Sequence, residues 1–240
     1  MAGVPRRAAA LAVTACAVAS LAAGCSSFGS SLKQVGAGTH SAPANTYTVS
    51  ARVTTLTVDT AGSVTVTGTA GHGPVTVRES ASYSKTPPAA AHTVSGSALT
   101  LRYTCKTQLI CSVNYDITVP RGTAVHAEGR EGSVTLTSLS GPVTAQTLTG
   151  LITANGLSSP SAVLKSGAGG IDATFAAPPA SVQASTDAGS IVISVPGGPS
   201  YRVSAHAVVG VTTVKVRHAA ASSHVITAHS DLGSVTISPS

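Results

Sequence analysis

The chain has 240 residues, of which 42% are hydrophobic and 9% are charged. This composition excludes a charge-solvated disordered protein, and the charged share lies well below the ~25% of ordinary globular chains. The formal charge is +6, and no run of Lys and Arg interleaved with aromatic residues is present, so we expect no nucleic-acid partner.

The first 24 residues are typical of an export signal. A pair of arginines precedes an apolar run over 8–24, which is short for a stable membrane span. The run ends in Leu21-Ala22-Ala23-Gly24-Cys25 and resembles the lipobox of bacterial lipoprotein signal peptides. The resemblance implies that Cys25 is diacylated and anchors the protein to the outer face of the cell membrane. That family usually has Leu where Ala22 stands, and ordinary cleavage after Ala17-Val18-Ala19 is the alternative.

The segment that follows is rich in Ser, Gly, Ala and Pro and has no periodic apolar pattern, which is typical of a flexible linker. From Tyr47 onward, apolar and polar residues alternate with a period of two, which predicts half-buried strands. We therefore divide the chain into a signal peptide (1–24), a flexible tether (25–45) and one all-β domain (46–240).

A short motif of the type Gly-Ser-Val-Thr recurs along this domain. From Gly132, the steps to Gly150, Gly170 and Gly189 are 18, 20 and 19 residues. Such a period predicts a β-solenoid, which is a β-helix-like stack of short single strands joined by glycine turns. An antiparallel β-sandwich, whose turns recur every ~8–12 residues, is the alternative. The motif glycines that we expect at turns are Gly62, Gly132, Gly141, Gly150, Gly170, Gly189 and Gly233.

The same motif predicts which side chains stack on one another. The expected inward layers are Val134 with Leu136, Ile152 with Ala154, and Ile171 with Ala173. Thr135 and Thr137 should face outward, because side chains alternate between the two faces of a strand.

These motifs, together with the stretch Asn114–Thr123 and its Val-Pro-x-Gly-Thr turn, resemble the bacterial "putative adhesin" domain. That family is built from repeats and has a β-helical architecture. The resemblance covers about 46–238 and implies a cell-surface or periplasm-facing binding or structural module without catalytic residues. Asp commonly follows the glycine in that family, whereas Ser or Pro dominates here.

Cysteine and histidine could supply a disulfide or a metal site. Cys105 and Cys111 lie six residues apart in a chain that we expect to be exported, so a disulfide is predicted. His218, His224 and His229 follow one another at steps of six and five. No pair has the short even offset, of two or four residues, that close same-face ligands on one strand require, so we expect surface histidines, no metal and no cofactor.

Catalysis has little support in the sequence. The chain has no nucleophile-elbow Gly-x-Ser-x-Gly and no phosphate-binding loop. Its acids are dispersed, and Glu128 and Glu131 beside Arg130 are interpreted as a solvated charge cluster. We expect a non-enzymatic envelope protein whose Thr and Ser rows bind a glycan or another surface protein. The alternatives are an envelope polysaccharide-acting enzyme, which would need acids clustered on one face, and an extracytoplasmic sensor.

Overall fold

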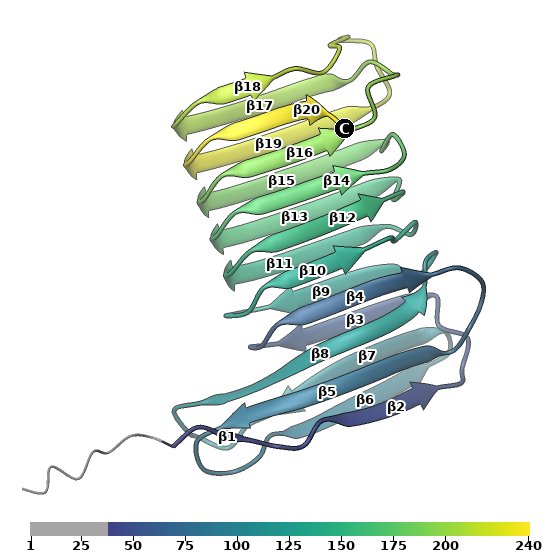
Figure 1. The fold of residues 1–240 in the computed structure, drawn as a ribbon, viewed down its shortest axis with the longest axis vertical. Coiled ribbons are helices and arrows are strands. Elements are labelled where there is room, and N and C mark those ends of the chain that lie inside the picture. Colours follow the sequence, from purple (N-terminus) through teal and green to yellow (C-terminus); the bar gives the residue numbers. More distant parts are fainter. Residues whose placement is uncertain (1–37) are drawn as a thin grey trace, which may run out of the picture. The chain divides into compact units, whose positions relative to one another are not determined.

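The computed structural model describes residues 38–240 (Figure 1). The predicted signal peptide, Cys25 and most of the predicted tether lie outside these residues. All regular structure in the described part is β, in twenty strands. This part contains no helix that is long and apolar enough to cross a membrane.

The strands form two mixed sheets. Sheet A has eleven strands in the order β1-β5-β8-β4-β10-β12-β14-β16-β20-β18, and β2 also pairs with β5. Its strands are β1 (His40–Ser41), β2 (Asn45–Val49), β4 (Val64–Thr69), β5 (Val75–Tyr83), β8 (Cys111–Pro120), β10 (Val134–Thr137), β12 (Ile152–Leu157), β14 (Ile171–Phe175), β16 (Ile191–Val195), β18 (Thr212–Val214) and β20 (Val235–Pro239).

Sheet B has nine strands in the order β17-β19-β15-β13-β11-β9-β3-β7-β6. Its strands are β3 (Thr55–Thr60), β6 (Ala89–Ser95), β7 (Ala98–Thr104), β9 (Ala124–Gly129), β11 (Val143–Thr149), β13 (Ser161–Ala168), β15 (Ser181–Ala188), β17 (Arg202–Val209) and β19 (Val225–Leu232). The strand β1 and the first residue of β2 fall within the segment that we interpreted as the tether.

The chain alternates between the two sheets from β9 onward, and strands within each sheet pair in parallel there. Antiparallel pairs occur among β1, β2, β5 and β8 of sheet A and between β6 and β7 of sheet B. At the C-terminal end, β19 lies between β15 and β17, and β20 lies between β16 and β18. The last two strands are therefore inserted between the strands β17 and β18, which precede them in sequence, and the rest of the stack.

The predicted stacking layers are confirmed by the strand register. Val134 and Leu136 of β10 lie opposite Ile152 and Ala154 of β12. Those two residues in turn lie opposite Ile171 and Ala173 of β14. All six side chains are buried, whereas Thr135 and Thr137 are only half-buried. The core between the sheets consists mostly of Val, Leu, Ile and Ala, and each large aliphatic side chain that it buries contributes about 1.5–3 kcal/mol.

A column of glycines runs along the edge where sheet B strands end and sheet A strands begin, on the left in Figure 1. A methyl group on any one of them would meet the backbone of the neighbouring layer, which is a column glycine in every case except Gly62, where it is Val113. Only glycine lets adjacent turns approach this closely. The members of this glycine column are Gly62, Gly132, Gly150, Gly169, Gly189, Gly233 and Gly210.

Two of the predicted turn glycines lie outside this column. In the β13–β14 turn the column residue is Gly169, with φ +153°, and not Gly170. The spacing of the motif could not separate two consecutive glycines, because both lie in the same turn. Gly141 lies at the opposite edge, where a methyl group would meet the backbone of Thr123.

Buried hydroxyl groups donate hydrogen bonds to the carbonyl groups of the column glycines. Each lies three residues before a column glycine and donates to the glycine carbonyl of the preceding layer. The four bonds are Thr147 to Gly132 at 3.0 Å, Ser166 to Gly150 at 3.2 Å, Thr186 to Gly169 at 2.8 Å and Ser230 to Gly189 at 2.8 Å. These bonds matter because a buried carbonyl without a donor destabilises the fold.

Candidate binding surface

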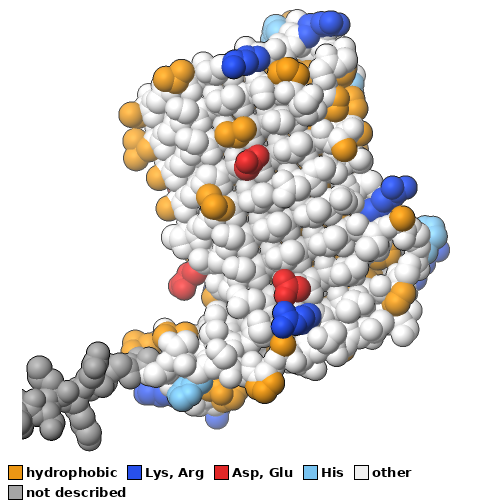
Figure 2. Space-filling view, in the orientation of Figure 1, with side chains coloured by type: hydrophobic (Ala, Val, Ile, Leu, Met, Phe, Trp, Pro, Cys, Tyr) orange, Lys and Arg blue, Asp and Glu red, His pale blue; other side chains and the backbone are white. Residues whose placement is uncertain are grey.

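The outer face of sheet A carries two rows of mostly polar side chains, which we call the hydroxyl grid; its strands pair in register except at an irregularity between β12 and β14 that follows Ala154. Successive strands lie about 4.8 Å apart and alternate residues about 7 Å apart, so the grid spacing is regular. One row contains Thr65, Thr135, Thr153, Asp172, Val192 and Thr236, and the other contains Thr67, Thr137, Asn155, Thr174, Ser194 and Ser238. Figure 2 shows this face as mostly uncharged, with few hydrophobic groups.

The outer face of sheet B carries charged and polar side chains instead. One row reads across adjacent strands as Asp59, Glu128, Gln146, Lys165, Ser185, His229 and His206. A hollow of about 260 Å³ lies over the middle of this row and includes Glu128, Lys165 and Asp187 in its wall. The two sheets therefore present chemically different faces to solvent.

The charge cluster that we interpreted around Arg130 also includes an acid from a distant strand. Arg130 forms an ion pair with Asp59, whose carboxylate lies 3.4 Å away and comes from a strand 71 residues earlier. Asp59 is also the direct cross-strand neighbour of Glu128. The sequence missed this contact because β3 and β9 become neighbours only through the long excursion of β4 to β8.

The histidines singled out in the sequence do not converge on one site. His229 stacks on His206 with ring centroids 5.7 Å apart and lies 2.8 Å from Asp231. The Nδ1 atom of His224 lies 2.8 Å from the carbonyl oxygen of Pro179. His218 is exposed and belongs to neither contact. Within residues 38–240, no three His, Cys, Asp or Glu side chains are placed to hold a metal ion.

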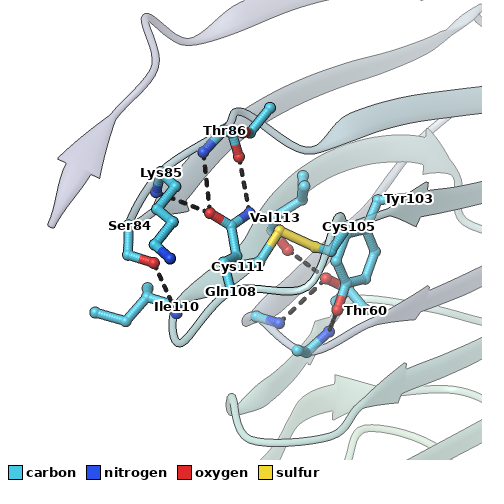
Figure 3. Close-up of a disulfide and its surroundings, with 12 residues drawn as sticks. Thr60, Ser84, Lys85, Thr86, Tyr103, Cys105, Gln108, Ile110, Cys111 and Val113 are labelled. Atoms are coloured by element: carbon cyan, nitrogen blue, oxygen red, sulfur yellow. Dashed lines mark hydrogen bonds between the residues drawn. A yellow bond between two sulfur atoms is a disulfide. The ribbon is translucent and has the colours of Figure 1, made fainter. Parts of the chain in front are cut away.

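Cys105 and Cys111 form the predicted disulfide (Figure 3). Gln108, in the loop that the disulfide closes, fixes this loop to the β5–β6 connection. Its amide oxygen accepts hydrogen bonds from the backbone amides of Lys85 and Thr86, and its amide nitrogen donates to the carbonyl of Thr86 at 2.8 Å. No local pattern predicts this role of Gln108, because it depends on a loop 22 residues away. The disulfide and Gln108 together stabilise the antiparallel end of the domain.

Two tyrosines at that end have perturbed acidities. Burial, reinforced by the negative charge of Glu79, raises the pKa of Tyr47 to about 12. Burial also raises the pKa of Tyr115, whose hydroxyl donates to the carbonyl of Arg102 at 3.4 Å. Burial thus favours the neutral form of both phenols, which pack in or against the core.

A ridge of exposed aliphatic side chains lies on the turns beside the glycine column. Figure 2 shows hydrophobic groups along this left-hand edge. The ridge consists of Leu148, Leu151, Val208, Val209, Val211 and Leu232, each more than half exposed. Exposed apolar groups that cluster in this way are typical of surfaces that contact other macromolecules.

Comparisons with known proteins found similarity in structure only. No protein-family model matches the chain, and no curated protein matches it. A "putative cell adhesion protein" from Clostridium sporogenes is 12% identical, with a TM-score of 0.44 and coverage of 82% of this chain and 99% of the other. A "putative adhesin" from Bacteroides fragilis is 16% identical, with a TM-score of 0.45 and coverage of 82% and 97%. A "putative adhesin" from Parabacteroides distasonis is 12% identical with a TM-score of 0.29. Identities and TM-scores this low do not transfer a function to this chain.

Proposed function

We propose that this protein is a lipid-anchored component of the cell envelope whose all-β domain is a non-catalytic, adhesin-like binding module. The hydroxyl grid of sheet A carries this proposal. Its threonines are held in register by parallel pairing, as in Thr135 opposite Thr65 and Thr153. An array made mostly of hydroxyl donors and acceptors, with Asp172 as its one charged member, matches the hydroxyl groups of a glycan or the polar surface of another envelope protein.

We further propose that the region from β9 to β20 is a β-solenoid. The supporting observations are the alternation of the chain between the sheets, the parallel pairing within each sheet and the glycine column. The antiparallel β-sandwich describes β1, β2 and β5 to β8 better. The binding face would then be built from solenoid layers and closed at one end by antiparallel strands.

The proposed location is the outer surface of the membrane, with two acyl chains on Cys25. Two chains hold a protein stably at a bilayer, whereas one chain binds only marginally. The disulfide between Cys105 and Cys111 supports an oxidising, extracytoplasmic compartment.

Intact mass and detergent partitioning of the protein from its own host test the anchor. We expect the wild-type chain to enter the detergent phase with a diacylglyceryl mass on its new N-terminal Cys25. The variant Cys25→Ala should stay in the aqueous phase, and Cys16→Ala serves as the matched control that should behave like wild type. A soluble wild-type product beginning near Ser20 would contradict the anchor and leave a secreted domain.

Binding to isolated host envelope material tests the hydroxyl grid. Exchange of both Thr135 and Thr153 for lysine places two charges in the middle of the grid without touching the core. In the matched control, Thr144 and Thr227 on the outer face of sheet B are exchanged for lysine. The proposal requires that the sheet A variant loses most of its envelope binding and that the sheet B variant keeps it; equal loss in both would contradict it.

One observation favours a second candidate function, which is an enzyme acting on envelope polysaccharide. Asp59 and Glu128 are cross-strand neighbours, and paired carboxyl groups are the usual machinery of glycoside hydrolysis. Release of reducing sugar from host envelope glycan, abolished by either Asp59→Asn or Glu128→Gln, would establish this function. The ion pair of Asp59 with Arg130 favours a structural role for the same group.

A further inference from the structure

A hollow of about 340 Å³ lies at the edge opposite the glycine column, where sheet A strands end and sheet B strands begin. Four connections form its wall: the segment before β3, the β4–β5 loop, the β8–β9 turn and the β10–β11 turn. The residues that the argument uses are Arg52, His72, Arg121 and Thr123. Each comes from a segment outside the hydroxyl grid, so the hollow is a separate site.

The wall of the hollow is cationic. Arg52, Arg121 and His72 line it, and no Asp or Glu does. Elsewhere in residues 38–240, Arg78 and Arg130 each form an ion pair with an aspartate. Arg52 and Arg121 form none within the same residues. Their positive charges are therefore not neutralised by an ion pair within the described residues, as is also true of most other Lys and Arg side chains there.

A buried hydroxyl group in the same wall has no hydrogen-bond partner. Thr123 is 1% exposed, and its Oγ1 atom is the one buried side-chain polar atom in residues 38–240 without a partner. Every other buried hydroxyl in this part of the chain, such as that of Thr186 or Ser230, donates to a carbonyl. Buried polar groups are almost always paired, so this hydroxyl is an exception at the wall of the hollow.

Glycines keep the hollow open. A methyl group added at Gly71, Gly73 or Gly122 would meet no atom within 4 Å, so each borders free space. The volume lies near the lower limit of small-molecule sites, which span about 300–1,000 Å³. The space suits one charged group together with the sugar or phosphodiester unit that carries it, rather than a long polymer segment.

We propose that this hollow binds an oxyanion, a carboxylate or phosphate group carried by an envelope glycan. The guanidinium groups of Arg52 and Arg121 bind the oxyanion through paired N–H donors, which match the geometry of carboxylate and phosphate oxygens. His72 lies in the same wall and supplies a further ring N–H donor. The inference rests on the proposed envelope-binding function only for the source of the anion.

Calorimetric titration of the full chain in detergent tests the hollow. The probes are trigalacturonate as the carboxylate source, poly(glycerol phosphate) as the phosphate source and maltotriose as the neutral control. We expect one or both anionic probes to bind and maltotriose not to bind. Arg52→Gln and Arg121→Gln should each weaken binding at least about 10-fold, since hydrogen bonds to charged groups are the strong ones. The charge-matched control Arg202→Gln, on β17 outside the hollow, should keep wild-type affinity.

A steric variant separates the site from the general charge of the protein. Gly73→Leu fills the hollow and leaves every charge in place, and because Gly73 borders open space the unfolding midpoint should not change. It should abolish binding of the anionic probes. Absence of binding by both anions, or equal weakening by Arg202→Gln and Arg121→Gln, would overturn the inference. Failure of the proposed function looks different, because the chain would then ignore host envelope material although the anionic probes still bind.

Discussion

Replacement of Gly169 by alanine is the most direct test of the glycine column. Gly169 has φ +153°, a backbone conformation that residues with a Cβ atom rarely adopt. A methyl group there would also overlap the carbonyl oxygen of Gly150 in the neighbouring layer. The substitution therefore forces two turns apart in the middle of the stack, where parallel strands on both sides hold them in place.

The expected loss of stability is large for a single methyl group. An unfavourable φ costs about 1–3 kcal/mol, and forcing extra atoms into a packed region costs a further ~1–3 kcal/mol. A total near 3 kcal/mol corresponds to a fall in melting temperature of about 6–12 °C, because 1 kcal/mol shifts a domain of 150–250 residues by about 2–4 °C.

The adjacent glycine provides the control. A methyl group at Gly170 has Ser190 O as its nearest contact at 3.2 Å, and Gly170 does not have a left-handed φ. We expect Gly170→Ala to cost less than about 1 kcal/mol, because only a small adjustment is needed. Urea unfolding followed by far-UV circular dichroism measures both variants. Equal destabilisation by the two substitutions, or a Gly169→Ala variant as stable as wild type, would contradict the close packing assigned to Gly169 in the glycine column.

Three further predictions concern the buried polar groups and the antiparallel end. Thr186→Val should lower the free energy of unfolding by about 1–3 kcal/mol in urea denaturation, because it leaves a buried carbonyl without its donor; an unchanged midpoint would contradict this. The raised pKa values of Tyr47 and Tyr115 mean that the unfolded chain loses tyrosine protons first, so stability should be constant below about pH 10 and fall as the pH approaches 12. Replacing both tyrosines by phenylalanine should flatten this fall, and an equally steep fall would refute the assignment. Reduction of the disulfide, or exchange of Cys105 and Cys111 for serine, should lower the free energy of unfolding by at most about 2–3 kcal/mol, because the loop is short. Calorimetry measures this loss, and no loss would mean that hydrogen bonds alone hold the loop.

The sequence predicts local pattern well and long-range neighbours poorly. Alternation gave the strands, and the motif spacing gave the stacking of Val134 and Leu136 on the next layer, because both follow from side-chain direction within a strand. The disulfide followed from two cysteines in an exported chain. The ion pair between Arg130 and Asp59 could not be predicted, since it depends on which distant strand lies beside β9.

The C-terminal strand order shows the same limit. β17 and β19 carry the same alternation, so nothing in the pattern tells which of them lies next to β15. The structure places β19 there, with Ala184 opposite Ala228, and moves β17 to the edge. Burial follows from this order: Ile226 and Ala228 of β19, which has a neighbouring strand on each side, are buried, whereas the inward side chains of the edge strand β17, such as Val203, are only partly buried.

The two edges of the stack are under different physical demands, and this difference explains where a binding site can form. At the glycine column, adjacent layers approach so closely that the column positions tolerate no side chain, and buried hydroxyls such as that of Thr186 are committed to the carbonyls. At the opposite edge Gly141 also packs closely on the β8–β9 turn, but glycines of the β4–β5 loop such as Gly73 border open space around the hollow. Residues beside that space can change without breaking the layer contacts, because loops carry few of the interactions that hold the core. A ligand site therefore belongs at the edge of Arg52 and Arg121, and the glycine edge serves the fold.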